Sequence, residues 1–122
     1  MAKKILVVDD EVNIVVSLEF LVKRAGYELR TANNGEQALA QVAQFEPDLI
    51  LLDVMMPKIS GFEVCRRIRM NSAWQHIKII MLTAKGREVE MTKGLDLGAD
   101  AYVIKPFSTK ELMAEIKKHL ED

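Results

Sequence analysis

The chain has 122 residues, of which 49% are hydrophobic and 29% charged, and its formal net charge is −1. This length fits one domain, residues 1–122, and the small net charge gives no support for nucleic-acid or membrane binding through bulk charge. No apolar run approaches the roughly 18 residues that a membrane span requires. The apolar stretch near the N-terminus ends at Asp9 without a cleavage pattern, so we expect a cytoplasmic protein.

Strand and helix patterns alternate through the first half of the chain. Consecutive apolar residues predict buried strands, apolar residues at helical spacing predict helices, and Gly26 favours a helix stop. The elements expected here are a strand at 5–8, a helix over 14–25, a weaker strand at 28–32, and a helix that Asn34 caps and that ends near Pro47.

The same alternation continues to the end of the chain. Strands are expected at 49–52, 77–82 and 101–104, and helices from Ser60, over about 87–97, and from Ser108. Ser60 with Glu63, and Ser108 with Glu111, have the spacing of a capping box. The helix over 87–97 is the weakest, because a glycine inside a helix costs about 1 kcal/mol relative to alanine.

Five strands that alternate with five helices predict a three-layer α/β sandwich. The strands are apolar on consecutive residues, which indicates that both faces of the sheet are covered, as in a parallel sheet. We expect the first strand to be interior, with the sheet reversing beside it, so that a crevice opens at the carboxyl ends of the strands.

Polar side chains follow four of the predicted strands at the point where each strand ends. Asp9 and Asp10 follow the first strand, Asp53 the third, Thr83 the fourth and Lys105 the fifth. Because the carboxyl ends of parallel strands lie at one edge of the sheet, these side chains are expected to converge on one site. Each signal is weak singly, and the set at successive strand ends is strong.

Three carboxylates and one ammonium leave this cluster with a charge of −3 + 1 = −2. Carboxylates held close together repel unless some are protonated or a cation lies among them. Oxygen ligands favour Mg²⁺, which leaves room for a phosphoryl group. A carboxylate can itself form an aspartyl phosphate, and Asp53 is the candidate because it stands alone. Asp10 could instead simply cap the first helix.

Several motifs in this order resemble the response-regulator receiver domain over essentially the whole chain. They are Val7-Val-Asp-Asp-Glu11, Leu52-Asp-Val-Met-Met-Pro57 with Gly61, Met81-Leu-Thr-Ala84, Gly98-Ala-Asp100 with Tyr102, and Lys105-Pro-Phe107. The resemblance implies a CheY-like, flavodoxin-like (βα)5 fold with strand order 2-1-3-4-5. The motifs are closest to receivers of the OmpR/PhoB class.

The resemblance also implies roles for individual residues. Asp53 would accept a phosphoryl group, and Mg²⁺ or Mn²⁺ would be held by Asp9, Asp10, Asp53 and the backbone carbonyl of Met55. Lys105, placed by a cis bond to Pro106, would bind a phosphoryl oxygen. Thr83 and Tyr102 would be switch positions, and Met55 and Lys85 would tune the phosphoryl lifetime, although Lys85 is otherwise read as an ordinary exposed lysine.

On this resemblance the chain is a phosphoacceptor switch and not a conventional enzyme. The donor would be a sensor histidine kinase or a phosphotransfer protein, and the face of the fourth helix, fifth strand and fifth helix would control a downstream effector. The OmpR/PhoB class pairs through that face. Ala101, Met91 and Glu115 stand here where the class carries charges suited to pairing, so at most a weak homodimer is expected.

Three other functions are known for folds of this kind. A flavin-binding electron carrier would need an uncharged phosphate loop after the first strand, where Asp9, Asp10 and Glu11 stand. A phosphatase of the haloacid dehalogenase type would need a second Asp at the position of Met55. A receiver fold that binds proteins independently of phosphorylation remains the serious alternative.

Overall fold

The structure is a computed structural model that describes residues 2–84 and 89–121. Its strands are β1 (Lys4–Val8), β2 (Glu28–Ala32), β3 (Leu49–Asp53), β4 (Lys78–Ala84) and β5 (Ala101–Lys105). Its helices are α1 (Val12–Arg24), α2 (Gly35–Phe45), α3 (Gly61–Met70), the 3-10 turn η1 (Ser72–Trp74), α4 (Val89–Asp96) and α5 (Thr109–Leu120). No helix in these ranges is both long and apolar enough to cross a membrane.

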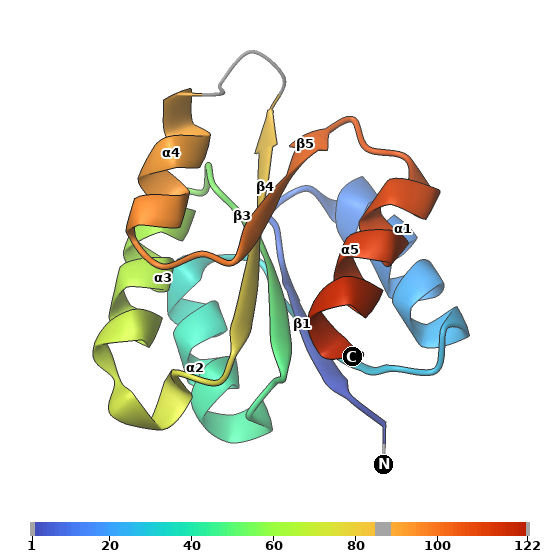
Figure 1. Cartoon of the computed structure of the whole chain (residues 1–122), viewed down its shortest axis with the longest axis horizontal. Coiled ribbons are helices and arrows are strands. Elements are labelled where there is room, and N and C mark those ends of the chain that lie inside the picture. The colour runs from blue at the N-terminus through green and yellow to red at the C-terminus, as the bar shows by residue number, and fades with distance from the viewer. Residues whose placement is uncertain (1, 85–88, 122) are drawn as a thin grey trace.

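All five strands are parallel and lie in the order β2-β1-β3-β4-β5, which confirms the expected topology. Helices α2, α3 and α4 cover one face of the sheet, and α1 and α5 cover the other (Figure 1). The chain order reverses beside β1, so the crevice predicted from the sequence falls at the carboxyl ends of β1 and β3.

The three interior strands, β1, β3 and β4, each contribute to two separate cores, because successive side chains point to opposite faces of a sheet. Leu6 and Val8 of β1 pack in the core beneath α2 and α3, whereas Ile5 and Val7 pack in the core beneath α1 and α5. The consecutive apolar residues of the sequence are thus divided between the two sides of the sheet. The interior strands are therefore buried on both faces, as the sequence predicts.

Side-chain caps start three of the helices, as the sequence predicts. The Asn34 Oδ1, Ser60 Oγ and Ser108 Oγ atoms accept hydrogen bonds from the backbone N–H groups three residues later, at 2.8, 3.2 and 3.0 Å. Glu63 departs from a reciprocal capping box, since its carboxylate accepts hydrogen bonds from Arg66 and Arg67 instead. These caps fix where α2, α3 and α5 begin.

One sequence expectation about a helix start differs from the structure, and one expected helix can be compared only at its end. The first helix has Glu11 at its N-cap position with no side-chain cap, so the reading of Asp10 as a simple cap is wrong. The fourth helix is expected over about 87–97, and among the described residues α4 spans Val89–Asp96, so it ends one residue before the predicted end. Residue 87 lies outside the described ranges.

Candidate functional site

Three carboxylates meet at the carboxyl edge of the sheet. Asp9 follows β1, Asp10 follows it directly, and Asp53 is the last residue of β3. One carboxylate oxygen from each of these residues lies within 4.8 Å of the other two. Asp9 and Asp53 are buried, Asp53 with only 6% of its surface exposed, while Asp10 is exposed. Two buried carboxylates this close need compensation from a cation or a proton.

The pairing of β1 with β3 explains why these groups converge. Val8 is in register with Leu52, so Asp9 and Asp53 each follow one residue of the same pair. The Asp9 N–H donates to the carbonyl of Ala32 on β2, and its Oδ1 accepts from the Glu11 N–H at 2.9 Å. The Asp9 side chain is therefore held in place by local backbone contacts.

Lys105 supplies the positive charge of the site. Its Nζ lies 2.8 Å from Asp9 Oδ2, 3.4 Å from Asp53 Oδ1 and 3.7 Å from Glu11 Oε1. It comes from the end of β5, and the peptide bond between Lys105 and Pro106 is cis. The ammonium contacts two of the three clustered carboxylates and leaves an uncompensated negative charge.

The charges of the site shift the pKa values of Asp53 and Lys105. Burial raises the pKa of Asp53 to about 6, the Asp9 carboxylate adds to the rise, and Lys105 and the Met55 N–H oppose it. Burial alone would lower the pKa of Lys105, but its contacts with Asp9 and Asp53 raise it above its ordinary value. Asp53 is therefore ionised at neutral pH, although at a cost in free energy, and Lys105 stays protonated.

Thr83 presents a buried hydroxyl without a partner. It lies near the end of β4, next to β3 in the sheet, and its Oγ1 has no hydrogen-bond partner among the described residues. Only 3% of Thr83 is exposed. A buried hydroxyl without a partner carries a desolvation cost, which a ligand that supplies an acceptor oxygen would remove.

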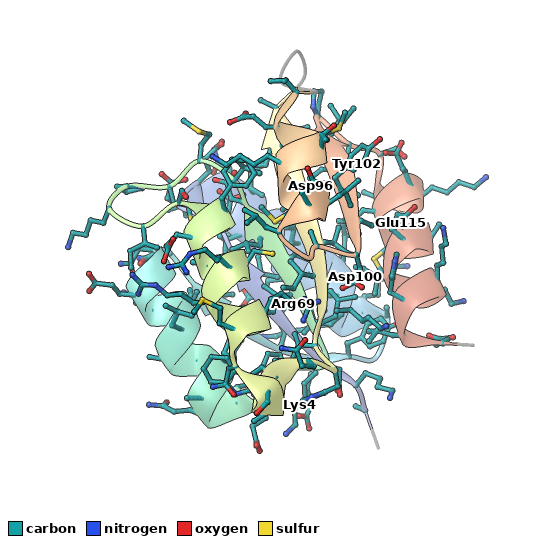
Figure 2. All side chains as sticks on the ribbon, turned by 60° about the vertical axis from the view of Figure 1, so that its left-hand side comes forward. Lys4, Arg69, Asp96, Asp100, Tyr102 and Glu115 are labelled. Carbon is teal, nitrogen blue, oxygen red and sulfur yellow. The ribbon has the colours of Figure 1, made fainter. Side chains whose placement is uncertain are left out.

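Three other residues were predicted to take part in the site: Met55, Tyr102 and Lys85. The Met55 N–H donates to Asp53 Oδ1 at 3.4 Å, and its side chain is exposed. Tyr102 is 39% exposed and lies on the surface between α4 and α5 (Figure 2), and in the sheet it pairs with Met81, whereas Thr83 pairs with Ile104. Lys85 is outside the described residues.

Two further residues shape the site, and the sequence analysis gave them no role. Glu11 brings a fourth carboxylate toward Lys105, and its place directly after the acidic pair was the available signal. Gly61 starts α3 so close to β3 that an added Cβ would overlap the Asp53 carbonyl oxygen. A glycine directly after the predicted helix start at Ser60 was a weaker signal of close backbone approach.

The donor set fits a hard divalent cation. Its three carboxylates can supply oxygen ligands, and no cysteine or histidine belongs to the group. Oxygen-only ligands favour Mg²⁺ over Zn²⁺, and a dication would neutralise the charge of −2 that Lys105 leaves. The arrangement can hold a metal ion and, through Lys105 and Thr83, the oxygens of a phosphoryl group.

Comparisons with known proteins point to one family. The model for the response regulator receiver domain matches residues 5–117. The alkaline phosphatase synthesis transcriptional regulatory protein PhoP of Bacillus subtilis is 50% identical over 117 residues, which are 96% of this chain and 48% of that protein. The chain thus spans about half the length of this relative.

Solved structures agree with the sequence matches. A putative response regulator from Chloroflexus aurantiacus has a TM-score of 0.95 and 36% identity, with 100% of both chains covered. The chemotaxis response regulator CheY4 of Vibrio cholerae has a TM-score of 0.92 and 33% identity, with 98% of this chain and 100% of that chain covered. The expected CheY-like, flavodoxin-like fold is confirmed by these neighbours and by the strand order.

Proposed function

This chain belongs to the response-regulator receiver family of two-component signalling, and we propose that its residues 1–122 form one receiver domain that is phosphorylated on Asp53. The observation that carries the proposal is one cluster of charged and polar side chains at the carboxyl edge of the sheet. Asp53 lies 3.4 Å from the Lys105 ammonium and within 4.8 Å of the other two aspartates, and the buried Thr83 hydroxyl has no partner among the described residues.

The phosphoryl donor in this proposal is a phosphohistidine on a sensor kinase or a phosphotransfer protein. A carboxylate oxygen of Asp53 attacks phosphorus, the new P–O bond forms, and the P–N bond to the donor imidazole breaks. The leaving imidazole takes up a proton from solvent. Hydrolysis later restores the carboxylate when water attacks the same phosphorus and inorganic phosphate leaves.

The residues of the chain have distinct roles in this transfer. Lys105 neutralises charge that develops on the phosphoryl oxygens, because a fixed cation in a buried site stabilises such charge strongly. The Met55 N–H, which donates to Asp53 Oδ1, helps to orient the nucleophile. Asp9 and Asp10, with Asp53 and the Met55 carbonyl, would hold Mg²⁺ or Mn²⁺. When bound, the metal neutralises carboxylate and phosphoryl charge.

Phosphorylation would then shift the population of two arrangements of the chain. The modification adds roughly −1.5 to −2 charge and strong acceptor oxygens, which the unpartnered Thr83 hydroxyl could reach. An arrangement that binds those oxygens better gains population. Tyr102 is exposed on the face formed by α4, β5 and α5, so we propose that its inward rotation reports the switch to an effector. Met55 and Lys85 would set the lifetime of the phosphoryl group on Asp53.

The output and the partners are proposed from the relatives. PhoP of Bacillus subtilis is named as a transcriptional regulatory protein, and this chain matches about half of it. We propose that the receiver controls a downstream effector domain or protein of comparable kind, and that its own function is switching and not turnover of a substrate. Homodimer formation through α4, β5 and α5 would be weak.

Intact mass after incubation with acetyl phosphate tests the proposal. Wild type with Mg²⁺ should gain one phosphoryl group, and omission of Mg²⁺ or the substitution Asp53→Asn should prevent the gain. Asp96→Asn is the matched control, because Asp96 is an exposed aspartate on α4 and its loss should leave the gain intact.

Phosphorylation that survives in Asp53→Asn would overturn the assignment of the acceptor. No mass gain in folded wild type with Mg²⁺ would favour the alternative, a receiver fold that binds its partner independently of phosphorylation. In that case the partner should be captured equally well by wild type and by Asp53→Asn.

A further inference from the structure

The loop that joins β3 to α3 carries part of the proposed site. Residues 54–60 lie between Asp53, the last residue of β3, and Gly61, the first residue of α3. The Met55 N–H donates to Asp53 Oδ1, and the Met55 carbonyl is one of the proposed metal ligands. The position of this loop therefore sets the position of backbone groups that the proposed chemistry needs.

Hydrogen bonds fix the two ends of the loop but not its middle. The Val54 N–H donates to the Leu82 carbonyl on β4 at 3.1 Å, and the Gly61 N–H donates to the Val54 carbonyl at 2.9 Å. Within the part of the chain that the structure describes, no backbone group of residues 56–59 forms a hydrogen bond. The middle of the loop is therefore held by its side chains.

The loop turns sharply just before Ile59. Lys58 has a φ of +68°, in the left-handed region that favours glycine. A residue other than glycine keeps such a conformation only where the surrounding structure holds it there. The next residue, Ile59, is partly buried and packs against the core beneath α2 and α3, as Met56 does. These two side chains anchor the middle of the loop.

Ile59 also lies directly against the first residue of α2, the helix next to α3 on the same face of the sheet (Figure 1). A Cβ added to Gly35 would lie 2.7 Å from the Ile59 Cβ and 3.1 Å from its carbonyl oxygen, shorter than the 3.4 Å at which ordinary contact begins. The glycines with positive φ in the described ranges are Gly26 and Gly98. Gly35 therefore answers to the close approach of Ile59 and not to a special backbone conformation.

An added methyl group at position 35 could not be relieved by rotation of a side chain. The Ile59 Cβ is bonded to the backbone, and the carbonyl oxygen belongs to it, so the backbone of the loop would have to move. Helix α2 is the more firmly held partner, because the Asn34 cap accepts from the Gln37 N–H at 2.8 Å. A misplacement of about 1 Å near reacting groups can lower a rate about 10²-fold.

We propose that the contact between Ile59 and Gly35 positions the Met55 backbone beside Asp53, and so sets how well the site binds Mg²⁺ and accepts a phosphoryl group. Both are positioning residues, which touch no reacting atom. The inference rests on the proposed function, because the Met55 carbonyl has this role only in a site that holds a metal ion. It makes α2, from which the proposed chemistry uses no side chain, a support of the site.

Titration of the whole isotopically labelled chain with Mg²⁺, followed by NMR, tests the contact from the side of α2. Gly35→Ala should shift the Met55 amide signal in the metal-free chain. It should also weaken Mg²⁺ binding about tenfold, a usual loss when the support of a metal ligand is removed. Gly94→Ala is the matched control, because a Cβ there would meet its nearest neighbour at 3.4 Å. That variant should do neither.

Two variants of Ile59 separate the contact with Gly35 from packing in general. Ile59→Val keeps the Cβ and the Cγ2 branch, which are the side-chain atoms nearest Gly35. It should bind Mg²⁺ as tightly as wild type does, although urea unfolding should show some loss of stability. Ile59→Leu keeps the number of carbon atoms but loses the branch at Cβ. It should weaken Mg²⁺ binding, and phosphorylation by acetyl phosphate at low Mg²⁺ should slow with it.

Equal Mg²⁺ affinities of Ile59→Val and Ile59→Leu would overturn the inference even if Asp53 is phosphorylated, and this pair decides alone if Gly35→Ala does not fold. An unchanged Met55 amide signal in folded, metal-free Gly35→Ala would also overturn it, and that readout needs neither metal nor donor. Failure of acetyl phosphate to modify folded wild type with Mg²⁺ would instead overturn the proposed function.

Discussion

Charged side chains at the two ends of the sheet differ in how well they are paired. At the amino edge, Arg69 donates to the carbonyls of Ile77 and Gly98 at 2.7 and 2.8 Å and to Asp100 at 2.9 Å, and Asp100 also accepts from the Ile79 N–H. At the carboxyl edge, Asp53 has a raised pKa and the Thr83 hydroxyl has no partner among the described residues.

This contrast separates structural polar groups from ligand-binding ones. Arg69, labelled with Asp100 in Figure 2, joins the end of α3 to the starts of β4 and β5. The guanidinium N–H groups of Arg69 have acceptors in these carbonyls and in Asp100, so the charged pair stabilises the amino edge. At the carboxyl edge charge is costly in the free protein, and a cation or a phosphoryl group would relieve that cost. Substitutions at the two edges should therefore have opposite effects on stability.

The largest effect is expected from Arg69→Met. The substitution leaves the Asp100 carboxylate and two carbonyl oxygens without their donor, and breaking such a partly buried pair costs about 3–4 kcal/mol. Urea unfolding followed by circular dichroism measures the loss. Arg67→Met is the control, because Arg66 would still pair with Glu63 after the exposed Arg67 is lost, and surface pairs contribute about 0–1 kcal/mol. Equal losses in both variants would contradict the proposed role of Arg69.

Replacement of an aspartate by asparagine should raise the free energy of unfolding at the carboxyl edge and lower it at the amino edge. Asp53→Asn removes a carboxylate whose pKa is about 6 in the folded chain. A rise of two pKa units corresponds to about 2–3 kcal/mol, so this variant should be more stable than wild type at pH 7 without Mg²⁺. Asp100→Asn should lose about 1 kcal/mol, because its bond to Arg69 is no longer charge-assisted. Urea unfolding of both variants and of wild type at pH 7 without Mg²⁺ measures the sign of each change in the free energy of unfolding.

The stability gain of Asp53→Asn should depend on pH in a defined window. In wild type the folded chain binds a proton at Asp53 more tightly than the unfolded chain does, between pH 4 and about 6. Stability contributed by the protonated group is therefore present below pH 4 and is lost as pH rises through about 6. The difference between Asp53→Asn and wild type should be small at pH 4 and reach its full value by pH 7. A difference that is constant with pH would show that burial does not shift this carboxyl.

Much of this contrast could be predicted from the sequence at the carboxyl edge and little of it at the amino edge. Asp9, Asp53 and Lys105 interrupt or follow apolar strands, where a charge is conspicuous. Arg69 stands among other charged residues near the end of a helix, where its typical role is a solvated cation close to the helix carboxyl end. Its partners are backbone carbonyls from distant segments, and the sequence carries no signal for those.

For a related reason, no signal in the sequence indicated a cavity beside Asp10 that is lined by Val12, Val15, Asn33 and Gln37 among others. Asn33 and Gln37 have the pattern of an ordinary helix start, and the capping bond to Asn34 confirms that pattern. Their position against Val12 and Val15 depends on β1 pairing with β2 and on α1 and α2 covering opposite faces. Long-range placement, and not local propensity, creates this wall of the site.

The smallest effects are expected at two glycines, Gly94 within α4 and Gly98 just after it. A Cβ at Gly94 would lie 3.4 Å from the Met81 side chain, an ordinary contact, so Gly94→Ala should stabilise α4 by up to about 1 kcal/mol. A Cβ at Gly98 would meet the Arg69 side chain at 2.7 Å, and its φ of +109° disfavours other residues. Gly98→Ala should therefore destabilise by about 1 kcal/mol.

Amide exchange of α4 distinguishes these two substitutions beyond their signs. Gly94→Ala acts on the helix itself, so it should slow exchange within α4, with little change at the amino edge. Gly98→Ala perturbs the Arg69 contacts, so it should speed exchange at the start of β4, where the Ile79 N–H donates to Asp100. Faster exchange in α4 of Gly94→Ala would mean that the contacts with Met81 and Phe62 do not tolerate the added methyl group, and that packing outweighs helix propensity at this position.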